Sequence, residues 1–282
     1  MAENSNIEWT KHTFNPHIGC TKVGPGCDHC YAEVWDARGL QQAETRWGPH
    51  AQRTRTSAAN WRKPIAWNKA AAALGEFHRV FCASLADVFD NHTSIQPQWR
   101  RDLGALIEAT PNLIWMLLTK RIGNARQYLA MMFPNGVPKN VWLGATVVNQ
   151  EEADRDIPKL IATPASIRFL SMEPLLGPVD LRGVTVAHGI NAMWPVDLVI
   201  VGGESGKGAR PCDPQWVRPI RDQCVAAGVA FHFKQWGNWH SDALRFTDMQ
   251  GRCPPPDMNI GKKAAGRTLD GRTWDEMPVV AA

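Results

Sequence analysis

Leu113-Ile-Trp-Met-Leu-Leu-Thr-Lys120 is a run of six apolar residues that ends in a threonine and a lysine. Apolar and polar residues do not alternate in this run, so the strand that it predicts is buried on both faces. Strands of this kind are typical of parallel sheets that are covered by helices. The stretch therefore predicts a central strand of an α/β protein.

Similar apolar runs recur on both sides of this stretch, with helical segments between them. Further strands are predicted at 79–84, 141–148, 167–171, 196–201 and 229–234, with one more before Cys20. Helices are predicted at 97–109, 150–160 and 214–228, where apolar residues recur at helical spacing or where acidic residues and glycine are placed as helix ends favour. About seven β/α units favour a full or partial (β/α) barrel over an open sheet.

The chain of 282 residues, 44% of them hydrophobic, is long enough for one barrel of this size and a short extension. We predict a barrel over 1–237, with an N-terminal loop rich in cysteine, and a basic, irregular C-terminal extension over 238–282 that packs on it. No run of about 18 apolar residues and no signal peptide is present, so we expect a cytoplasmic protein with no membrane partner. The net charge of +4 permits a nucleic-acid partner without requiring one.

Three of the seven cysteines, Cys20, Cys27 and Cys30, lie within eleven residues in the spacing C-x6-C-x2-C. In a reducing compartment, clustered cysteines indicate metal binding rather than disulfides. Three thiolates can hold three irons of a [4Fe–4S] cluster and leave the fourth iron open to a ligand. Alternatives are a structural zinc site completed by His17 or His29, inert buried cysteines, and a disulfide.

Polar residues follow the predicted strands at their carboxyl ends, where (β/α) barrels gather their functional groups. These residues are Cys20, Ser84, Asp87, Thr119, Lys120, Thr146, Glu173, Gly203, Glu204, Lys234 and Gln235. The sequence therefore predicts an active site at this end of the strands.

The run 200–208, Ile-Val-Gly-Gly-Glu-Ser-Gly-Lys-Gly, superficially resembles a phosphate-binding loop, but its glycines and its Ser/Thr position are out of register. Gly203 would let the backbone approach a ligand closely, and Glu204 would accept a hydrogen bond from it. Lys234, Gln235 and Trp236 are also predicted to contact substrate. Gln235 can pair with a base edge and Trp236 can stack on a base, and closure of the barrel is the structural alternative for all three residues.

The loop Asn15-Pro-His-Ile-Gly-Cys20, followed by Cys27-Asp-His-Cys30-Tyr31-Ala, resembles the cluster loop of radical S-adenosylmethionine enzymes, closest to the spore photoproduct lyase branch. Ser84-Leu-Ala-Asp87, Leu118-Thr-Lys120 and Met172-Glu-Pro174 are also similar to segments of that branch. The chain departs from the branch by three additional residues between its first two cysteines. Nearly the whole chain also resembles an uncharacterised three-cysteine family of phages and bacteria, of the DUF5131 type, for which no reaction is named.

The first resemblance implies that Cys20, Cys27 and Cys30 ligate a [4Fe–4S] cluster whose open iron binds S-adenosylmethionine, with an external electron donor. It implies that Tyr31 lies near the adenine, and that Ser84, Asp87, Lys120, Thr146 and Glu173 bind the cofactor. Lys120 and Glu204 join the three cysteines as candidate catalytic residues.

The expected function is that of a radical enzyme acting on a nucleobase or modified nucleotide, for example an isomerisation in phage thymine hypermodification. One alternative is a lyase that repairs DNA photolesions. The other belongs to a different class, a non-catalytic nucleic-acid-binding module stabilised by zinc.

Overall fold

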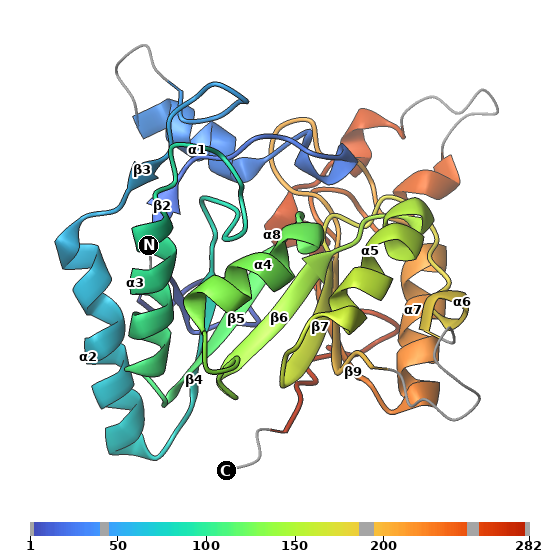
Figure 1. Ribbon diagram of the computed structural model, residues 1–282. Coiled ribbons are helices and arrows are strands. Elements are labelled where there is room, and N and C mark those ends of the chain that lie inside the picture. The colour runs from blue at the N-terminus through green and yellow to red at the C-terminus, as the bar shows by residue number, and fades with distance from the viewer. Residues whose placement is uncertain (1–2, 40–44, 186–194, 247–253, 280–282) are drawn as a thin grey trace. The chain divides into compact units, whose positions relative to one another are not determined.

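The computed structural model describes residues 3–39, 45–185, 195–246 and 254–279 (Figure 1). Seven strands form one sheet in the order β1-β4-β5-β6-β7-β8-β9. They are β1 (His12–Thr13), β4 (His78–Cys82), β5 (Leu113–Thr119), β6 (Val141–Thr146), β7 (Ile167–Met172), β8 (Leu198–Gly202) and β9 (Ala230–Gln235). The pairs β1–β4, β4–β5, β5–β6, β7–β8 and β8–β9 are parallel. The predicted α/β class is confirmed, as a partial (β/α) barrel with edge strands β1 and β9.

Helices alternate with these strands, as the sequence predicts. They are α1 (Tyr31–Gly39), α2 (Ala58–Leu74), α3 (Pro97–Glu108), α4 (Ile122–Met132), α5 (Gln150–Ala162), α6 (Arg182–Thr185), α7 (Pro214–Ala227) and α8 (Lys262–Ala265). Asp213 caps the N-terminus of α7 by accepting a hydrogen bond from the Gln215 N–H, and Gly228 ends it in the left-handed conformation. No helix among the described residues is both long and apolar enough to cross a membrane.

Short elements complete the fold. β2 (His17–Ile18) and β3 (Thr54–Arg55) form an antiparallel ribbon. The 3₁₀ helices are η1 (Pro25–Cys27), η3 (Ala243–Phe246) and η4 (Pro256–Met258).

The strand at 113–119 has the burial that its apolar run predicts. Six of its seven residues are buried, with Leu118 the exception. Trp115 lies opposite Val80 of β4 on one side and Val141 of β6 on the other, so β5 is an interior strand. Burial of apolar side chains on both faces is the main stabilising contribution that such a strand makes.

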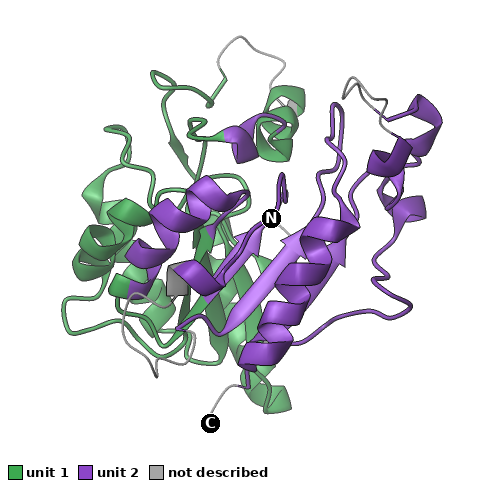
Figure 2. Cartoon of the chain, turned by 90° about the vertical axis from the view of Figure 1, so that its right-hand side faces the viewer, with its two compact units in different colours: residues 1–24, 30–145, 162–168 green, residues 25–29, 146–161, 169–282 purple. Residues whose placement is uncertain are grey.

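The chain consists of two compact units, coloured separately in Figure 2. Unit 1 comprises residues 1–24, 30–145 and 162–168, and unit 2 comprises 25–29, 146–161 and 169–282. The cysteine loop contributes to both, because Cys20 and Cys30 belong to unit 1 whereas Cys27 belongs to unit 2.

The residues after 237, predicted to be an extension packed on the barrel, contact β9 within unit 2. The Phe233 N–H donates to the Trp274 carbonyl at 2.9 Å, and the Trp236 N–H donates to the Gly266 carbonyl at 3.1 Å. These bonds engage part of the backbone of an edge strand that would otherwise be open to pairing with another chain.

Gly203 and Gly237 lie where the segments after β8 and β9 meet. A Cβ at Gly203 would lie 2.0 Å from the Trp236 carbonyl oxygen, and one at Gly237 would lie 2.1 Å from the Glu204 carbonyl oxygen. Both obstacles are backbone atoms, which no rotamer change can move aside. We expect Gly203→Ala to lower the free energy of unfolding by about 3 kcal/mol, because overpacking of this kind forces the backbone apart.

Gly177→Ala is the matched control for this prediction, to be compared by urea denaturation. The nearest atom to a Cβ at Gly177 is the Asn149 Cβ at 4.0 Å, so we expect its stability to stay close to that of the wild type. Equal stabilities for the two variants would contradict the close approach of the backbones at Gly203.

Candidate functional site

The three clustered cysteines are free thiols. Cys20 and Cys30 are half-buried and pack against the same small apolar group, Ala32, Trp47 and Leu85, within unit 1. Unit 1 therefore brings the first and the third cysteine of the motif to one place.

Cys27 is buried at the end of η1 in unit 2. Among the described residues, no three Cys, His, Asp or Glu side chains converge closely enough to hold a metal ion. Three reduced thiols on one loop fit an iron–sulfur cluster or zinc by the chemistry of their donor atoms. The cysteines therefore fit such a group by the type of their donor atoms and by their positions in the chain.

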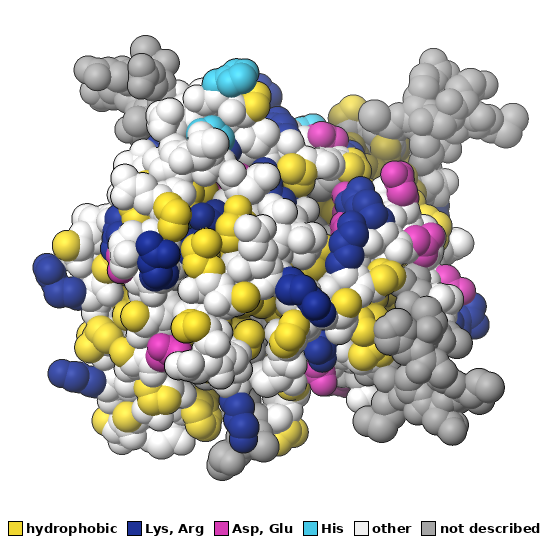
Figure 3. Space-filling view, viewed as in Figure 1, with side chains coloured by type: hydrophobic (Ala, Val, Ile, Leu, Met, Phe, Trp, Pro, Cys, Tyr) yellow, Lys and Arg dark blue, Asp and Glu magenta, His cyan; other side chains and the backbone are white. Residues whose placement is uncertain are grey.

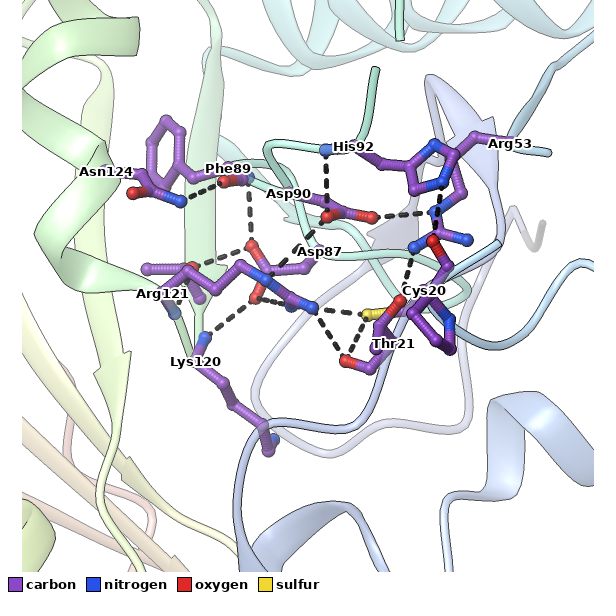
Figure 4. A network of polar contacts seen from close by, with 12 residues as sticks. Cys20, Thr21, Arg53, Asp87, Phe89, Asp90, His92, Lys120, Arg121 and Asn124 are labelled. Atoms are coloured by element: carbon purple, nitrogen blue, oxygen red, sulfur yellow. Dashed lines mark hydrogen bonds and ion pairs between the residues drawn. The ribbon is translucent and has the colours of Figure 1, made fainter. Parts of the chain in front are cut away.

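Asp87 is the centre of a buried polar network in unit 1 (Figure 4). Its Oδ1 accepts hydrogen bonds from the Thr119 hydroxyl at 2.7 Å and the Phe89 N–H at 2.9 Å. Its Oδ2 accepts from the Lys120 N–H at 2.9 Å and the Arg121 guanidinium at 3.4 Å. Both oxygens are therefore engaged in joining the segment after β4 to the end of β5.

Arg121 joins Asp87 to the first cysteine. Its guanidinium donates to the Thr21 carbonyl at 2.6 Å and to the Cys20 Sγ at 3.4 Å, and it lies 3.7 Å from an Asp90 carboxylate oxygen. Burial, and then the charge of Asp87, raise the pKa of the Cys20 thiol to about 11, while Arg121 acts in the opposite direction. The thiol is therefore protonated at neutral pH and would release its proton on binding a metal.

Arg53 completes the network on the side of Asp90. Its Nε donates to Asp90 at 2.8 Å, and one of its terminal nitrogens donates to the Thr21 hydroxyl at 2.6 Å. Its other terminal nitrogen donates to three backbone carbonyls between residues 46 and 51. Two arginines thus face two buried carboxylates, which is how buried charges are accommodated, and both also bond to Thr21, the residue after Cys20.

Tyr31 and Ser84, both predicted to bind the cofactor, are neighbours in unit 1. The exposed Tyr31 side chain donates its hydroxyl to the Ser84 carbonyl at 2.8 Å, and the Ser84 hydroxyl accepts from the Asn15 amide at 3.0 Å. Asn15 also accepts from the Leu85 N–H. The residue after the third cysteine and the segment after β4 are thereby joined, as a shared cofactor site would require.

Glu204 lies in a second network, within unit 2. Its buried carboxylate accepts from the Arg210 backbone N–H at 2.8 Å, from the Arg210 guanidinium at 2.7 and 2.8 Å, and from the His29 Nδ1 at 3.0 Å. Burial acts to raise the pKa of Glu204, but the hydrogen bonds from Arg210 and His29 outweigh it and lower that pKa below its usual value. Glu204 is therefore an ionised, fully engaged carboxylate.

Arg210 continues this network to the segment that carries the second cysteine. It pairs with the Asp28 carboxylate at 3.0 Å and donates to the Pro25 carbonyl at 2.8 Å. The His29 ring lies against Gly208, where an added Cβ would come within 3.1 Å of its Nε2. Residues on both sides of Cys27 are thus bound to the loop after β8, and we name the set His29, Glu204 and Arg210 the Glu204 clamp.

The remaining predicted site residues of unit 2 are engaged within the protein. Lys234 forms an ion pair with Glu173 at 2.6 Å. Thr146 is buried at the end of β6.

Gln235 and Trp236 are 4% exposed, so neither presents a base-binding surface in this structure. The Gln235 side chain donates to the Gly203 carbonyl and accepts from the Gly237 N–H, while the Trp236 indole donates to the Thr268 carbonyl. They secure the turn after β9 and do not close the barrel, the structural alternative that the sequence offered, because β9 is an edge strand. Their contact with substrate stays a prediction.

Lys120 is partly exposed, and Figure 4 shows its side chain extending away from Asp87. Four residues of these networks were not predicted from the sequence: Arg53, Asp90, Arg121 and Arg210. Arg121 could have been predicted as a site residue, because it directly follows Lys120 at a strand end. The other three stand in segments with no motif.

A family model described as "Protein of unknown function (DUF5131)" matches residues 4–278. The chain belongs to this family. The closer of the two resemblances is thereby confirmed. No curated protein and no solved structure matches the chain. The matched range includes residues of both units, and the cysteine loop, the Asp87 network and the Glu204 clamp all lie within it.

Proposed function

We propose that this DUF5131 protein is a radical S-adenosylmethionine enzyme in which Cys20, Cys27 and Cys30 hold a [4Fe–4S] cluster. When bound, the cluster and S-adenosylmethionine supply the electron and the C5′–S bond whose cleavage gives a 5′-deoxyadenosyl radical. The observation that carries the proposal is the set of three free thiols on one loop, two of which pack against one apolar group. The confirmed partial (β/α) barrel supports it.

The chain's own residues would hold and orient the cofactor. Tyr31 directly follows the third cysteine and bonds to Ser84 after β4, so the two residues would be suited to holding the adenine or ribose. Asp87 orders the backbone around Lys120 and Arg121, so its part would be to shape the site rather than to bind the cofactor directly. Glu173 and Lys234 form an ion pair near the ends of β7 and β9 and would offer the cofactor or the substrate one charge of each sign.

We propose a nucleobase or modified nucleotide as the substrate, with isomerisation in phage thymine hypermodification as one version and repair of a DNA photolesion as another. The positive net charge of +4 supports a partner that carries phosphate. On the face shown in Figure 3, lysines and arginines lie singly or in small groups, several of them beside Asp or Glu.

One observation favours the second candidate function, a zinc-stabilised nucleic-acid-binding module. The His29 Nδ1 is paired with the buried Glu204 carboxylate, and metal-ligating histidines commonly donate one ring N–H to a carboxylate. Cys20, Cys27, Cys30 and His29 would then be the four ligands of the zinc.

Anaerobic purification and cluster reconstitution distinguish the two functions. We expect a brown protein with about four irons per chain that bleaches on reduction with dithionite. With S-adenosylmethionine and dithionite it should release 5′-deoxyadenosine, detected by mass spectrometry, and candidate nucleosides added in turn should increase the release. A colourless protein that retains about one zinc per chain after the same treatment would establish the second function instead.

A further inference from the structure

Arg121 places a cationic N–H donor against the sulfur of a candidate cluster ligand. The distance from its guanidinium to the Cys20 Sγ is 3.4 Å, well within the range of hydrogen bonds to sulfur. Arg121 belongs to the turn between β5 and α4, whereas Cys20 follows β2, so the contact joins residues 101 positions apart. Figure 4 shows the guanidinium lying between Asp87 and the cysteine.

The guanidinium is held in this position from several sides. Its side chain is only 9% exposed, and it contacts the Asp87 carboxylate, the Asp90 carboxylate and the Thr21 carbonyl. A planar guanidinium group that is bonded to several fixed acceptors can adopt few other orientations. The N–H is therefore directed at the sulfur before any metal is bound.

Resting on the proposed function, we propose that Arg121 is a positioning residue that sets the reduction potential of a cluster bound through Cys20. Reduction adds one negative charge to the cluster, and part of this charge lies on its sulfur ligands. A cation that donates a hydrogen bond to one of those sulfurs stabilises the reduced form more than the oxidised form, so it raises the potential. Asp87 opposes this effect, because its negative charge faces the same guanidinium at 3.4 Å.

The test is an anaerobic redox titration of the reconstituted protein, followed by electron paramagnetic resonance of the reduced cluster. We expect Arg121→Gln to make reduction about tenfold less favourable, a downward shift of about 59 mV for one electron. Arg121→Lys keeps the positive charge but loses the planar guanidinium, so its reduction potential should shift downward by less than that of Arg121→Gln. Asp87→Asn should shift the potential upward, because it leaves the guanidinium charge less compensated.

Arg126→Gln is the matched control, since it removes one positive charge from the exposed face of α4 without a contact to Cys20, and its potential should equal that of the wild type. An unchanged potential in Arg121→Gln, with a full content of iron, would overturn the inference. If Arg121→Gln does not bind a cluster, the potentials of Arg121→Lys and Asp87→Asn provide the test. Shifts of the same sign in these two variants would overturn the inference. A wild-type protein without an iron–sulfur cluster would instead overturn the proposed function itself.

Discussion

Cys27→Ala should abolish the release of 5′-deoxyadenosine and leave the reconstituted protein without a stable [4Fe–4S] cluster. Cys27 is a buried free thiol in the middle of the motif, and alanine offers no ligand to the third iron. The measurement is iron and sulfide content per chain, together with mass spectrometry of the products after reduction in the presence of S-adenosylmethionine.

Cys224→Ala is the control for this result. Cys224 is also a free, buried cysteine, but it lies in α7, away from the motif in sequence, and burial raises the pKa of its thiol to about 12. Its loss should leave iron content and product close to those of the wild type. Persistence of 5′-deoxyadenosine in Cys27→Ala would remove Cys27 from the ligand set, and an equal loss in both variants would indicate general instability instead.

Most strands of the main sheet were predictable because they are short apolar runs with marked ends, whereas β1 (His12–Thr13) is not such a run. The predicted run 113–120 is only one residue longer than the observed β5. The agreement is close because both faces of the strand are buried, so its sequence is a continuous apolar run. The α7 helix was equally clear, because Gly228 stops it in a conformation that glycine adopts without strain.

The polar networks were not predictable in the same way, because their members come together only in the folded chain. Arg53 reaches Asp90 across 37 positions, and Arg210 reaches Asp28 across 182. No periodicity or local spacing encodes such a pair in a single sequence. Reasoning from strand ends located Asp87 and Glu204, but it treated each carboxylate as open to a ligand because their arginine partners were not visible.

The Glu204 clamp gives the loop after β8 a part in holding the second cysteine. Gly203 suggested a loop that approaches a ligand. In the structure Gly203 approaches the backbone at Trp236, and Gly208 approaches the His29 ring. The glycine-rich run is thus explained by contacts with the turn after β9 and with the cysteine loop, both inside unit 2. Arg210 bonds to both Glu204 and the segment around Cys27, so the clamp depends on this residue.

Arg210→Ala should lower the free energy of unfolding by about 3 kcal/mol, because it leaves the buried Glu204 charge largely uncompensated, although solvent screens the pair on the side of Arg210, which is 30% exposed. Glu204 is 6% exposed and, within the described part of the chain, would retain only His29 as a side-chain donor. Asp28 and the Pro25 carbonyl would lose the same partner, so the segment around Cys27 should loosen. Urea denaturation measures the first effect, and hydrogen exchange of residues 25–29 measures the second.

Arg218→Ala serves as the comparison, since Arg218 also pairs with a carboxylate in unit 2, that of Asp270, but on the surface, with the two side chains 39% and 36% exposed. Solvent screens that pair, so its loss should cost about 0.5 kcal/mol. If Arg210→Ala proved no less stable than Arg218→Ala, the Glu204 carboxylate would have to be compensated by other groups. Unchanged exchange at residues 25–29 would likewise show that the segment around Cys27 is held without Arg210, and the loop after β8 would then have no part in positioning the cysteine.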